Sequence, residues 1–324
     1  MKVLVTGGAG YIGSVVAREL LKHGHEVRVI DSLVYGGRSL LGLYVEEKFN
    51  FQYGDIRSVS FVRESLKGMD AVVHLAALVG DPACSRQQQL AREVNQEASI
   101  RLFELSHQQG IQRFIFASTC SNYGRMSDPS GYLTEESELK PVSFYAETKV
   151  AVEKEILKPA SVNGMSTSVV RFATIFGLSP RMRFDLTVNE FTMELFTKRK
   201  VTIYGEQFWR PYVHVRDAAV AIRLILDAPT KQVTGQAFNV GDTSQNYQKG
   251  QLVELIRSLL GGTVQIERVA QSEDPRDYKV SFDKIHRELG FKMTRPVEMG
   301  IREIMEALSQ GVVTDPENSL YRNS

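Results

Sequence analysis

The sequence predicts an α/β fold in which a doubly wound parallel sheet is joined to a smaller, mainly C-terminal lobe. Short β-branched segments alternate with longer amphipathic segments, as repeated βαβ units require. These segments cover residues 2–6, 12–23, 26–30, 71–75 and 113–117. The last segment is apolar on both faces, which is typical of a central strand covered by helices on each side.

The second half of the chain has a different pattern and is expected to form the smaller lobe. Helices are predicted over residues 186–197, 251–260 and 296–308. A strand-like segment at residues 237–241 is expected to return to the sheet, and the polar tail at residues 314–324 is expected to be frayed. The domain that contains the sheet is expected to comprise residues 1–178 and 211–245. The smaller lobe is expected to comprise residues 179–210 and 246–324.

The composition excludes several classes of protein. The 39 basic and 38 acidic residues nearly cancel, so the broad positive field needed to bind nucleic acid or a membrane surface is missing. Only Cys84 and Cys120 occur, without metal-ligand spacing, so we expect neither a disulfide framework nor a bound metal. No secretion signal and no run of roughly 18 apolar residues is present. A cytoplasmic protein is therefore expected.

A glycine-rich segment directly follows the first predicted strand and opens a helix. It reads Gly7-Gly8-Ala9-Gly10-Tyr11-Ile12-Gly13, a pattern typical of dinucleotide-binding Rossmann folds in this context. Gly7 and Gly10 permit a tight turn close to a diphosphate, and Gly13 lets the helix pack near the strand. The helix N-terminus at Tyr11 and Ile12 supplies N–H groups to the anion. The alternative is a purely structural glycine turn.

Acidic and small residues at the next strand ends are expected to complete the cofactor site. Asp31 ends the second strand 18 residues after Gly13, where a carboxylate accepts hydrogen bonds from the ribose hydroxyls and repels a 2′-phosphate. NAD is therefore favoured, although Arg38 leaves NADP open and a turn-forming Asp31 is the alternative. The remaining predicted cofactor residues follow the third and fourth strands and are Asp55, Ile56, Leu75, Ala76 and Ala77.

The catalytic candidates are a phenol and an ammonium on one helical face. Tyr145 and Lys149 are four residues apart, and they follow a fifth strand that ends in hydroxyls at Thr119 and Ser121, at the edge where such sheets bind ligands. A phenol working at neutral pH needs its pKa lowered by about three units, or about 4 kcal/mol. A nearby ammonium and a cationic nicotinamide can supply this. An ordinary surface helix is the alternative.

These residues together resemble the extended short-chain dehydrogenase/reductase superfamily, in its nucleotide-sugar epimerase/dehydratase branch, over nearly the whole chain. The resemblance implies that Tyr145 moves the proton of a sugar hydroxyl, that Thr119 hydrogen-bonds the same oxygen, and that Lys149 holds the nicotinamide ribose and lowers the pKa of Tyr145. It also implies NAD as cofactor and a nucleotide-diphosphate sugar as substrate. A homodimer is expected through the Tyr145 helix and a helix near residues 90–109.

Dehydratases and decarboxylases of this superfamily carry an acidic residue just after the catalytic Ser or Thr, whereas this chain has Cys120 and Ser121. We therefore expect oxidation and reduction rather than elimination. Cys120 is either a thiol in the substrate site or a small packed cysteine.

Cations and polar groups of the second half are expected to bind the substrate. By the resemblance, Arg210 and Arg276 match positions that hold the nucleotide diphosphate, and Asn189 matches a residue near the diphosphate or base. Thr174 and Arg183 are further candidates, and a surface or helix-capping role is the alternative for each.

Two segments, residues 179–186 and 273–278, resemble GDP-heptose 4-dehydrogenases of capsule pathways. The sequence thus predicts an NAD-dependent nucleotide-sugar 4-epimerase. A 4-dehydrogenase or reductase uses the same residues and stays open, and a dehydratase is disfavoured. A redox-sensing NAD-binding protein without catalysis typically loses the Tyr145 and Lys149 pair, which is present here.

Overall fold

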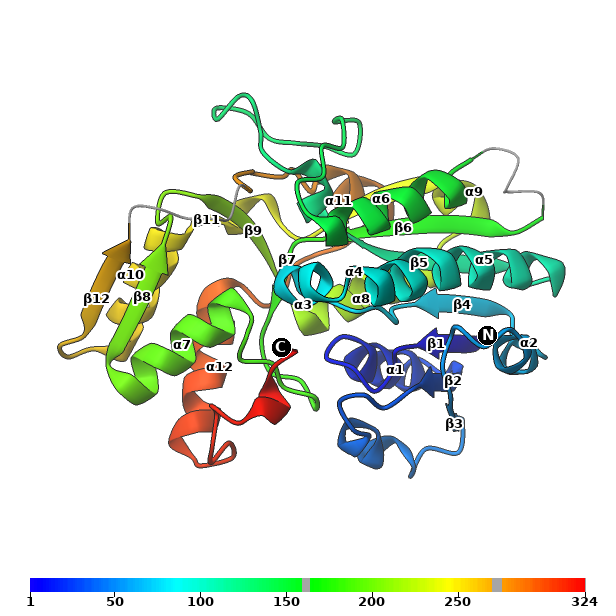
Figure 1. Cartoon of the computed structure of the whole chain (residues 1–324), viewed down its shortest axis with the longest axis horizontal. Coiled ribbons are helices and arrows are strands. Elements are labelled where there is room, and N and C mark those ends of the chain that lie inside the picture. Colours follow the sequence, from blue (N-terminus) through cyan, green and yellow to red (C-terminus); the bar gives the residue numbers. More distant parts are fainter. Residues whose placement is uncertain (159–163, 270–275, 324) are drawn as a thin grey trace.

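A parallel sheet of seven strands forms the centre of the molecule in the computed structural model, which describes residues 1–158, 164–269 and 276–323. Its order is β10-β6-β5-β4-β1-β2-β3 (Figure 1). The strands are β1 (Lys2–Thr6), β2 (Glu26–Asp31), β3 (Phe49–Tyr53), β4 (Ala71–His74), β5 (Arg113–Thr119), β6 (Ser166–Phe172) and β10 (Gln236–Val240). The order reverses beside β1, so the predicted doubly wound Rossmann sheet is confirmed.

Helices cover both faces of this sheet. Along β1, Val3 and Val5 join one apolar cluster and Leu4 joins the other, because successive side chains point to opposite faces. The first face is covered mainly by α1 (Gly13–Lys22) and α8 (Val215–Asp227). The second is covered by α2 (Val59–Leu66), α5 (Ala98–Gln108) and α6 (Phe144–Ile156). The central strands β4 and β5 are therefore buried on both sides, as the apolar run at residues 114–117 predicted.

The smaller lobe lies at one end of the molecule (Figure 1). Its helices α7 (Thr187–Lys198), α10 (Lys249–Leu260) and α12 (Val297–Ser309) share an apolar cluster that includes Val188, Leu252 and Ile301. Its strands are β7 (Thr174–Phe176), β9 (Trp209–His214) and β11 (Asn246–Gln248) in one sheet and β8 (Lys200–Tyr204) with β12 (Gln265–Val269) in another. A smaller, mainly C-terminal lobe is thus confirmed, and the exact domain boundaries stay a prediction.

Strand β10 returns from the second half of the sequence to pair in parallel with β6. Several short elements complete the described chain. The remaining helices are α3 (Asp81–Arg86), α4 (Gln88–Ala91), α9 (Thr230–Val233) and α11 (Asp283–Leu289). A π-helical turn at Arg92–Glu97 joins α4 to α5. The short 3-10 helices are η1 (Arg38–Leu43), η3 (Cys120–Tyr123), η5 (Thr243–Gln245) and η6 (Ser319–Tyr321).

The C-terminal tail packs against the lobe, contrary to the expectation that it is frayed. The carbonyl oxygen of Tyr321 accepts a hydrogen bond from the amide of Phe184 at 2.8 Å, and the two rings meet edge to face. The amide of Asn323 donates to Asp185 Oδ2 at 3.0 Å. The polar composition of the tail misled the prediction, because one aromatic residue and backbone hydrogen bonds are enough to dock it.

Candidate active site

The glycine turn is fitted to the backbone around it. A Cβ at Gly7, whose φ is +70°, would lie 2.8 Å from the backbone of Ala76, and a Cβ at Gly13 would lie 2.2 Å from the carbonyl oxygen of Gly7. No hydrogen bond within the described residues uses the amides of Tyr11 and Ile12, which precede the first turn of α1. These N–H groups at a helix N-terminus fit the diphosphate of a dinucleotide.

Asp31 lies at the end of β2, beside this turn. Its Oδ2 accepts from the amide of Ala9 at 3.0 Å, and its Oδ1 accepts from the amide of Leu33 at 2.8 Å. The turn is closed by the amide of Gly10, which donates to the carbonyl of Gly7 at 3.1 Å. Burial raises the pKa of Asp31 and the two amides oppose that shift. Asp31 thus shapes the turn, and its contact with the ribose stays a prediction.

The other predicted cofactor residues lie at the carboxyl ends of β3 and β4. Asp55 pairs with Arg57 at 2.7 Å, and this hydrogen-bonded pairing lowers its pKa. Ile56 is buried. Three partly buried residues follow β4, and they are Leu75, Ala76 and Ala77. The amides of the first two donate to Thr6 Oγ1 at 3.2 and 3.1 Å, which fixes this segment beside the glycine turn.

The first two turns of α6 hold the Tyr145 and Lys149 pair. Ser143 caps the helix by accepting from the amide of Ala146 at 3.3 Å. Lys149 Nζ donates to the carbonyl of Ala117 on β5 at 2.9 Å and lies 5.8 Å from the centroid of the Tyr145 ring. The side chain is 2% exposed, and burial lowers the pKa of Lys149 to about 8. The structure therefore brings the predicted pair to the carboxyl end of β5.

The residues that follow β5 divide between the site and the core. Thr119 Oγ1 accepts from the amide of Ser121 at 3.1 Å, and Ser121 Oγ lies 3.3 Å from the hydroxyl of Tyr278. Cys120 is fully buried, and its thiol donates to the carbonyl of Arg171 at 3.2 Å. Burial raises the pKa of this thiol well above its ordinary value. Cys120 is therefore a packed cysteine, and the prediction that its side chain contacts substrate is corrected.

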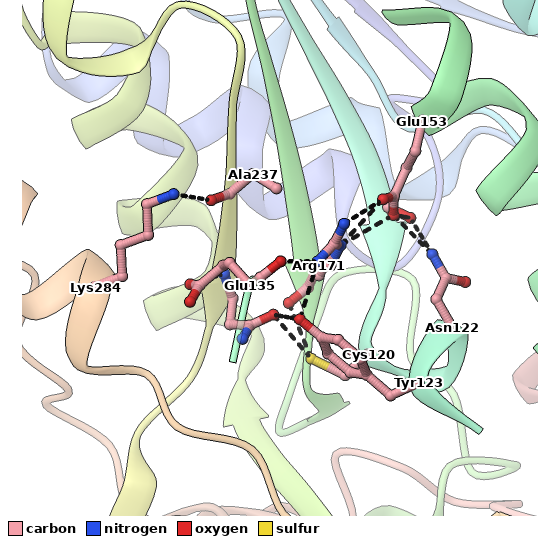
Figure 2. A network of polar contacts seen from close by, with 10 residues as sticks. Cys120, Asn122, Tyr123, Glu135, Glu153, Arg171, Ala237 and Lys284 are labelled. Carbon is pink, nitrogen blue, oxygen red and sulfur yellow. Dashed lines mark hydrogen bonds and ion pairs between the residues drawn. The ribbon is translucent and has the colours of Figure 1, made fainter. Parts of the chain in front are cut away.

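A buried polar network lies beneath the catalytic helix (Figure 2). Glu153 accepts from Ser118 Oγ and from Asn122 Nδ2, the latter at 2.7 Å. Arg171 on β6 donates to the same carboxylate through Nη2 at 2.8 Å and to the Tyr123 hydroxyl through Nη1 at 3.0 Å. The network thus ties α6 to the end of β5, to the turn after it and to β6, and it fixes the positions of the catalytic candidates.

Asp81 and Cys84 at the start of α3 influence the site, and the sequence analysis missed them. Burial raises the pKa of Tyr145, and Cys84 and Asp81 raise it further, whereas Arg183 and Arg276 lower it. This direction is opposite to the lowering expected from Lys149. Asp81 follows β4 by a few residues at the same sheet edge, and this position was a signal that could have identified it.

Two of the predicted substrate residues of the lobe are held by the protein itself. Arg183 forms a two-pronged pair with Asp185 at 2.9 and 2.8 Å. Asn189 is fully buried, and its amide nitrogen donates to the carbonyl of Arg183 at 2.8 Å and to the Tyr11 hydroxyl at 3.2 Å. Because both amide hydrogens are used, Asn189 positions Arg183 and the turn rather than presenting donors to a ligand. Thr174 is partly buried at the start of β7.

The two predicted diphosphate arginines border the same region. Arg210 on β9 is 4% exposed, donates to the carbonyl of Trp209 at 2.7 Å and lies 5.3 Å from the centroid of the Tyr278 ring. Arg276 pairs with Asp81 at 2.7 Å and is partly exposed. Since Tyr278 also meets Ser121, the structure brings these cations towards the end of β5.

Two structural features are absent from the described part of the chain. No cluster of His, Cys, Asp or Glu side chains there could hold a metal ion. None of the described helices combines the length and apolar character needed to cross a membrane.

A glycine-rich turn at the start of α1 and a Tyr–Lys pair at the carboxyl edge of the same sheet are typical of a dinucleotide-dependent α/β enzyme. A family model described as the NAD dependent epimerase/dehydratase family matches residues 3–241, and the chain belongs to this family. Its cofactor is therefore NAD.

The chain is similar both to epimerases and to dehydratases of nucleotide sugars. The chain is 28% identical over 322 residues to a UDP-glucose 4-epimerase of Corynebacterium glutamicum, with 94% of each protein covered. It is 30% identical over 318 residues to a dTDP-glucose 4,6-dehydratase of Streptomyces niveus, covering 94% of this chain and 92% of that protein. The solved structure of Thermotoga maritima UDP-glucose 4-epimerase with UDP-glucose matches with a TM-score of 0.86 at 26% identity, covering 96% of this chain and 100% of the other.

Similarity therefore gives the family and leaves the reaction open. The narrower resemblance to GDP-heptose 4-dehydrogenases is not confirmed by these comparisons. Residues 273–275, which carry part of that resemblance, lie outside the described residues.

Proposed function

We propose that this enzyme epimerises a nucleotide-diphosphate sugar at C4 through transient oxidation. The observation that carries the proposal is the contrast at the end of β5. Tyr145, Lys149 and Thr119 gather there, whereas the next residue, Cys120, has its thiol buried in the core with a raised pKa. Ser121 offers only a hydroxyl. The position that would supply an acid for elimination is therefore unsuited to it, and oxidation followed by reduction remains.

Proton transfer is the task of the chain's own residues. Tyr145 Oη takes the proton of the C4 hydroxyl and returns it after the sugar has turned. Thr119 Oγ1 already accepts from the amide of Ser121, so its hydroxyl hydrogen can be donated to the same sugar oxygen. NAD, held at the glycine turn by the amides of Tyr11 and Ile12, would supply the acceptor and donor for the C4 hydride. The proton and the hydride are each removed and restored, so the reaction balances.

Positive charge is needed to ionise Tyr145. Burial holds its pKa above the ordinary value, and Arg183 and Arg276 oppose this. The ammonium of Lys149 lies 5.8 Å from the centroid of the Tyr145 ring. These cations, together with the nicotinamide charge, favour the phenolate when the site is assembled.

Arg183, Arg210 and Arg276 are proposed to hold the substrate diphosphate, with Thr174 and Ser121 near the sugar. Guanidinium groups suit this task because their paired N–H donors match phosphate oxygens. By the family resemblance we also propose a homodimer through α6 and the helical run at residues 88–108.

The deciding experiment follows the products in deuterated water. NAD-loaded protein is incubated with UDP-, GDP-, dTDP- and CDP-sugars, and products are analysed by mass spectrometry and NMR while NADH absorbance is recorded. A C4 stereoisomer without deuterium on carbon is expected, because the hydride returns to the carbon it left. A two-dalton loss with lasting NADH would make the enzyme a 4-dehydrogenase. Loss of water would overturn the interpretation of Cys120 and Ser121.

Removal of one oxygen tests the role of Tyr145. The Tyr145→Phe variant should lose about 10²- to 10⁴-fold in kcat, the range for a missing general acid–base, while its affinity for NAD stays the same. Steady-state kinetics and NAD titration measure the two effects. Tyr132→Phe is the matched control, since Tyr132 is an exposed tyrosine that contacts Lys279. Turnover of Tyr145→Phe at the wild-type rate would reject the assigned role.

A further inference from the structure

Arg181 is a buried cation whose hydrogen-bonding capacity is only partly used. The residue is 6% exposed. Its Nη2 donates to the carbonyl oxygen of Arg322 in the C-terminal tail at 3.0 Å, and its guanidinium lies 4.3 Å from the centroid of the Tyr35 ring. The Nε and Nη1 atoms are buried without a hydrogen-bond partner. Two donors of one charged group are thus held in the interior and left unpaired.

Such an arrangement lowers the stability of the folded protein. A buried donor without an acceptor loses its hydrogen bonds to water, and no hydrogen bond within the protein replaces them. The nearest carboxylate does not relieve it. Asp185 is already bound by both prongs of Arg183 and by the amide of Asn323. Native proteins rarely keep unpaired buried donors unless a ligand completes them. An anionic ligand from outside the chain would accept hydrogen bonds from the two unpaired donors of Arg181.

The position of Arg181 shows which anion can reach it. Two residues earlier, Ser179 Oγ donates to the carbonyl of Tyr11 in the glycine turn at 2.7 Å. On the other side, Tyr35 belongs to the loop that follows Asp31 at the end of β2. The segment of Arg181 thus contacts both the glycine turn, through Ser179, and the loop after β2, through Tyr35.

We propose that Arg181 is a ligand of the dinucleotide diphosphate, to which Nε and Nη1 donate. The adjacent donors of a guanidinium match two phosphate oxygens, and the bond to the Arg322 carbonyl fixes the orientation of the group in advance. The inference rests on the proposed use of the glycine turn as an NAD site. The diphosphate of a nucleotide sugar offers the same chemistry, so the test separates the two sources.

The test measures two affinities of the full-length protein by calorimetry. The first is that of NAD⁺ for cofactor-stripped protein, and the second is that of UDP, GDP, dTDP or CDP, whichever binds wild type best, for NAD-loaded protein. Arg181→Gln should bind NAD⁺ about 10- to 100-fold more weakly, as expected for loss of a charge-assisted pair, and should keep its nucleoside-diphosphate affinity. The control is Arg113→Gln. Arg113 is the first residue of β5, at the end of the strand away from the proposed site, and it donates to the carbonyl of Ile225.

Equal NAD⁺ affinity in folded Arg181→Gln and wild type would overturn the proposal. So would weaker nucleoside-diphosphate binding with unchanged NAD⁺ binding, since the anion would then be the substrate. If Arg181→Gln does not fold, Arg181→Lys decides: it keeps the charge but not the fork, and a wild-type NAD⁺ affinity would reject the inference. Failure of the proposed reaction is a separate result, because wild type would then bind NAD⁺ and yield no C4 stereoisomer.

Discussion

Two buried cations, Lys149 of α6 and Arg171 of β6, contact groups near α6 and are held in opposite ways. Arg171 meets the helix at Glu153, with Nε and Nη2 donating to one carboxylate oxygen at 3.0 and 2.8 Å. Burial acts to lower the pKa of Arg171, but Glu153 outweighs burial and the pKa is raised. Among the described residues, no carboxylate forms an ion pair with the ammonium of Lys149, which donates to the carbonyl of Ala117 at 2.9 Å. Burial lowers the pKa of Lys149 to about 8, although Cys84 and Glu153 act to raise it.

The difference separates a structural cation, Arg171, from a cation of the proposed catalytic site, Lys149. The charge of Arg171 is neutralised where it stands, so the pair fixes α6 against β5 and β6 and has nothing left to offer a ligand (Figure 2). The charge of Lys149 is uncompensated, so it favours any negative charge that develops beside it, including that of a Tyr145 phenolate. Desolvated groups of this kind are concentrated at functional sites. They lower the stability of the fold there, and their altered pKa values serve the reaction.

The largest effect is expected when the paired cation is removed. Arg171→Met leaves Glu153 as a buried, uncompensated carboxylate, and the free energy of unfolding should fall by about 3–5 kcal/mol. Denaturant titration at neutral pH measures this loss. Arg113→Met is the control: Arg113 starts the neighbouring strand β5 and contacts a carbonyl and a hydroxyl, so about 1 kcal/mol or less is expected. Equal losses of unfolding free energy in the two variants would show that the buried ion pair of Arg171 and Glu153 contributes no more to stability than the surface contacts of Arg113.

Removal of the unpaired cation should have the opposite sign. Lys149→Met relieves a buried charge whose pKa is lowered from 10.5 to about 8, which corresponds to about 3 kcal/mol at about 1.4 kcal/mol per unit. The lost contacts with Ala117 and Phe116 offset part of this. A net gain of about 1–3 kcal/mol in unfolding free energy at pH 7 is expected, together with loss of turnover.

The pH dependence sharpens this test. Because the folded pKa of Lys149 is below the unfolded one, the unfolded state binds more protons between about pH 8 and about pH 10.5. The stability of wild type relative to Lys149→Met should therefore rise with pH across that window. Denaturation of both proteins at about pH 7 and about pH 9.5 measures the difference. A constant difference, or a less stable variant at pH 7, would contradict the account.

The sheet and the glycine turn could be predicted because they rest on local signals. The first strand has the predicted limits, Lys2–Thr6, since β-branched alternation reports burial directly. Gly13 could be assigned because a side chain there would strike the carbonyl of Gly7, and such a requirement fixes the residue type. The Tyr145 and Lys149 spacing is likewise a property of one helix.

The remaining features depend on contacts between distant segments. Asn122 meets Glu153 across 31 positions, and nothing periodic links them. Glu153 nevertheless continues the face of α6 that carries Tyr145 and Lys149, at intervals of four residues, so its inward position could have been inferred. The tail was misjudged because Tyr321 packs on Phe184, a contact that the polar composition around it conceals.

The smallest effect is expected at an ion pair outside the core. Asp81 pairs with Arg276 where both side chains are about one-quarter exposed, so Asp81→Asn should change the free energy of unfolding by about 1 kcal/mol or less. Its effect on chemistry has a definite direction. The Asp81 carboxylate raises the pKa of Tyr145, so the acidic limb of kcat against pH should move to lower pH in Asp81→Asn.

Glu64→Gln is the control for Asp81→Asn, because Glu64 pairs with Lys67 on the surface of α2 and should leave the limb unchanged. An upward shift in Asp81→Asn would mean that the carboxylate acts mainly by holding Arg276 near Tyr145, since losing that cation raises the pKa of the phenol. A downward shift would mean that its own charge dominates. An exposed pair can thus influence the reaction while contributing little to stability, the reverse of what is expected for Arg171 and Glu153.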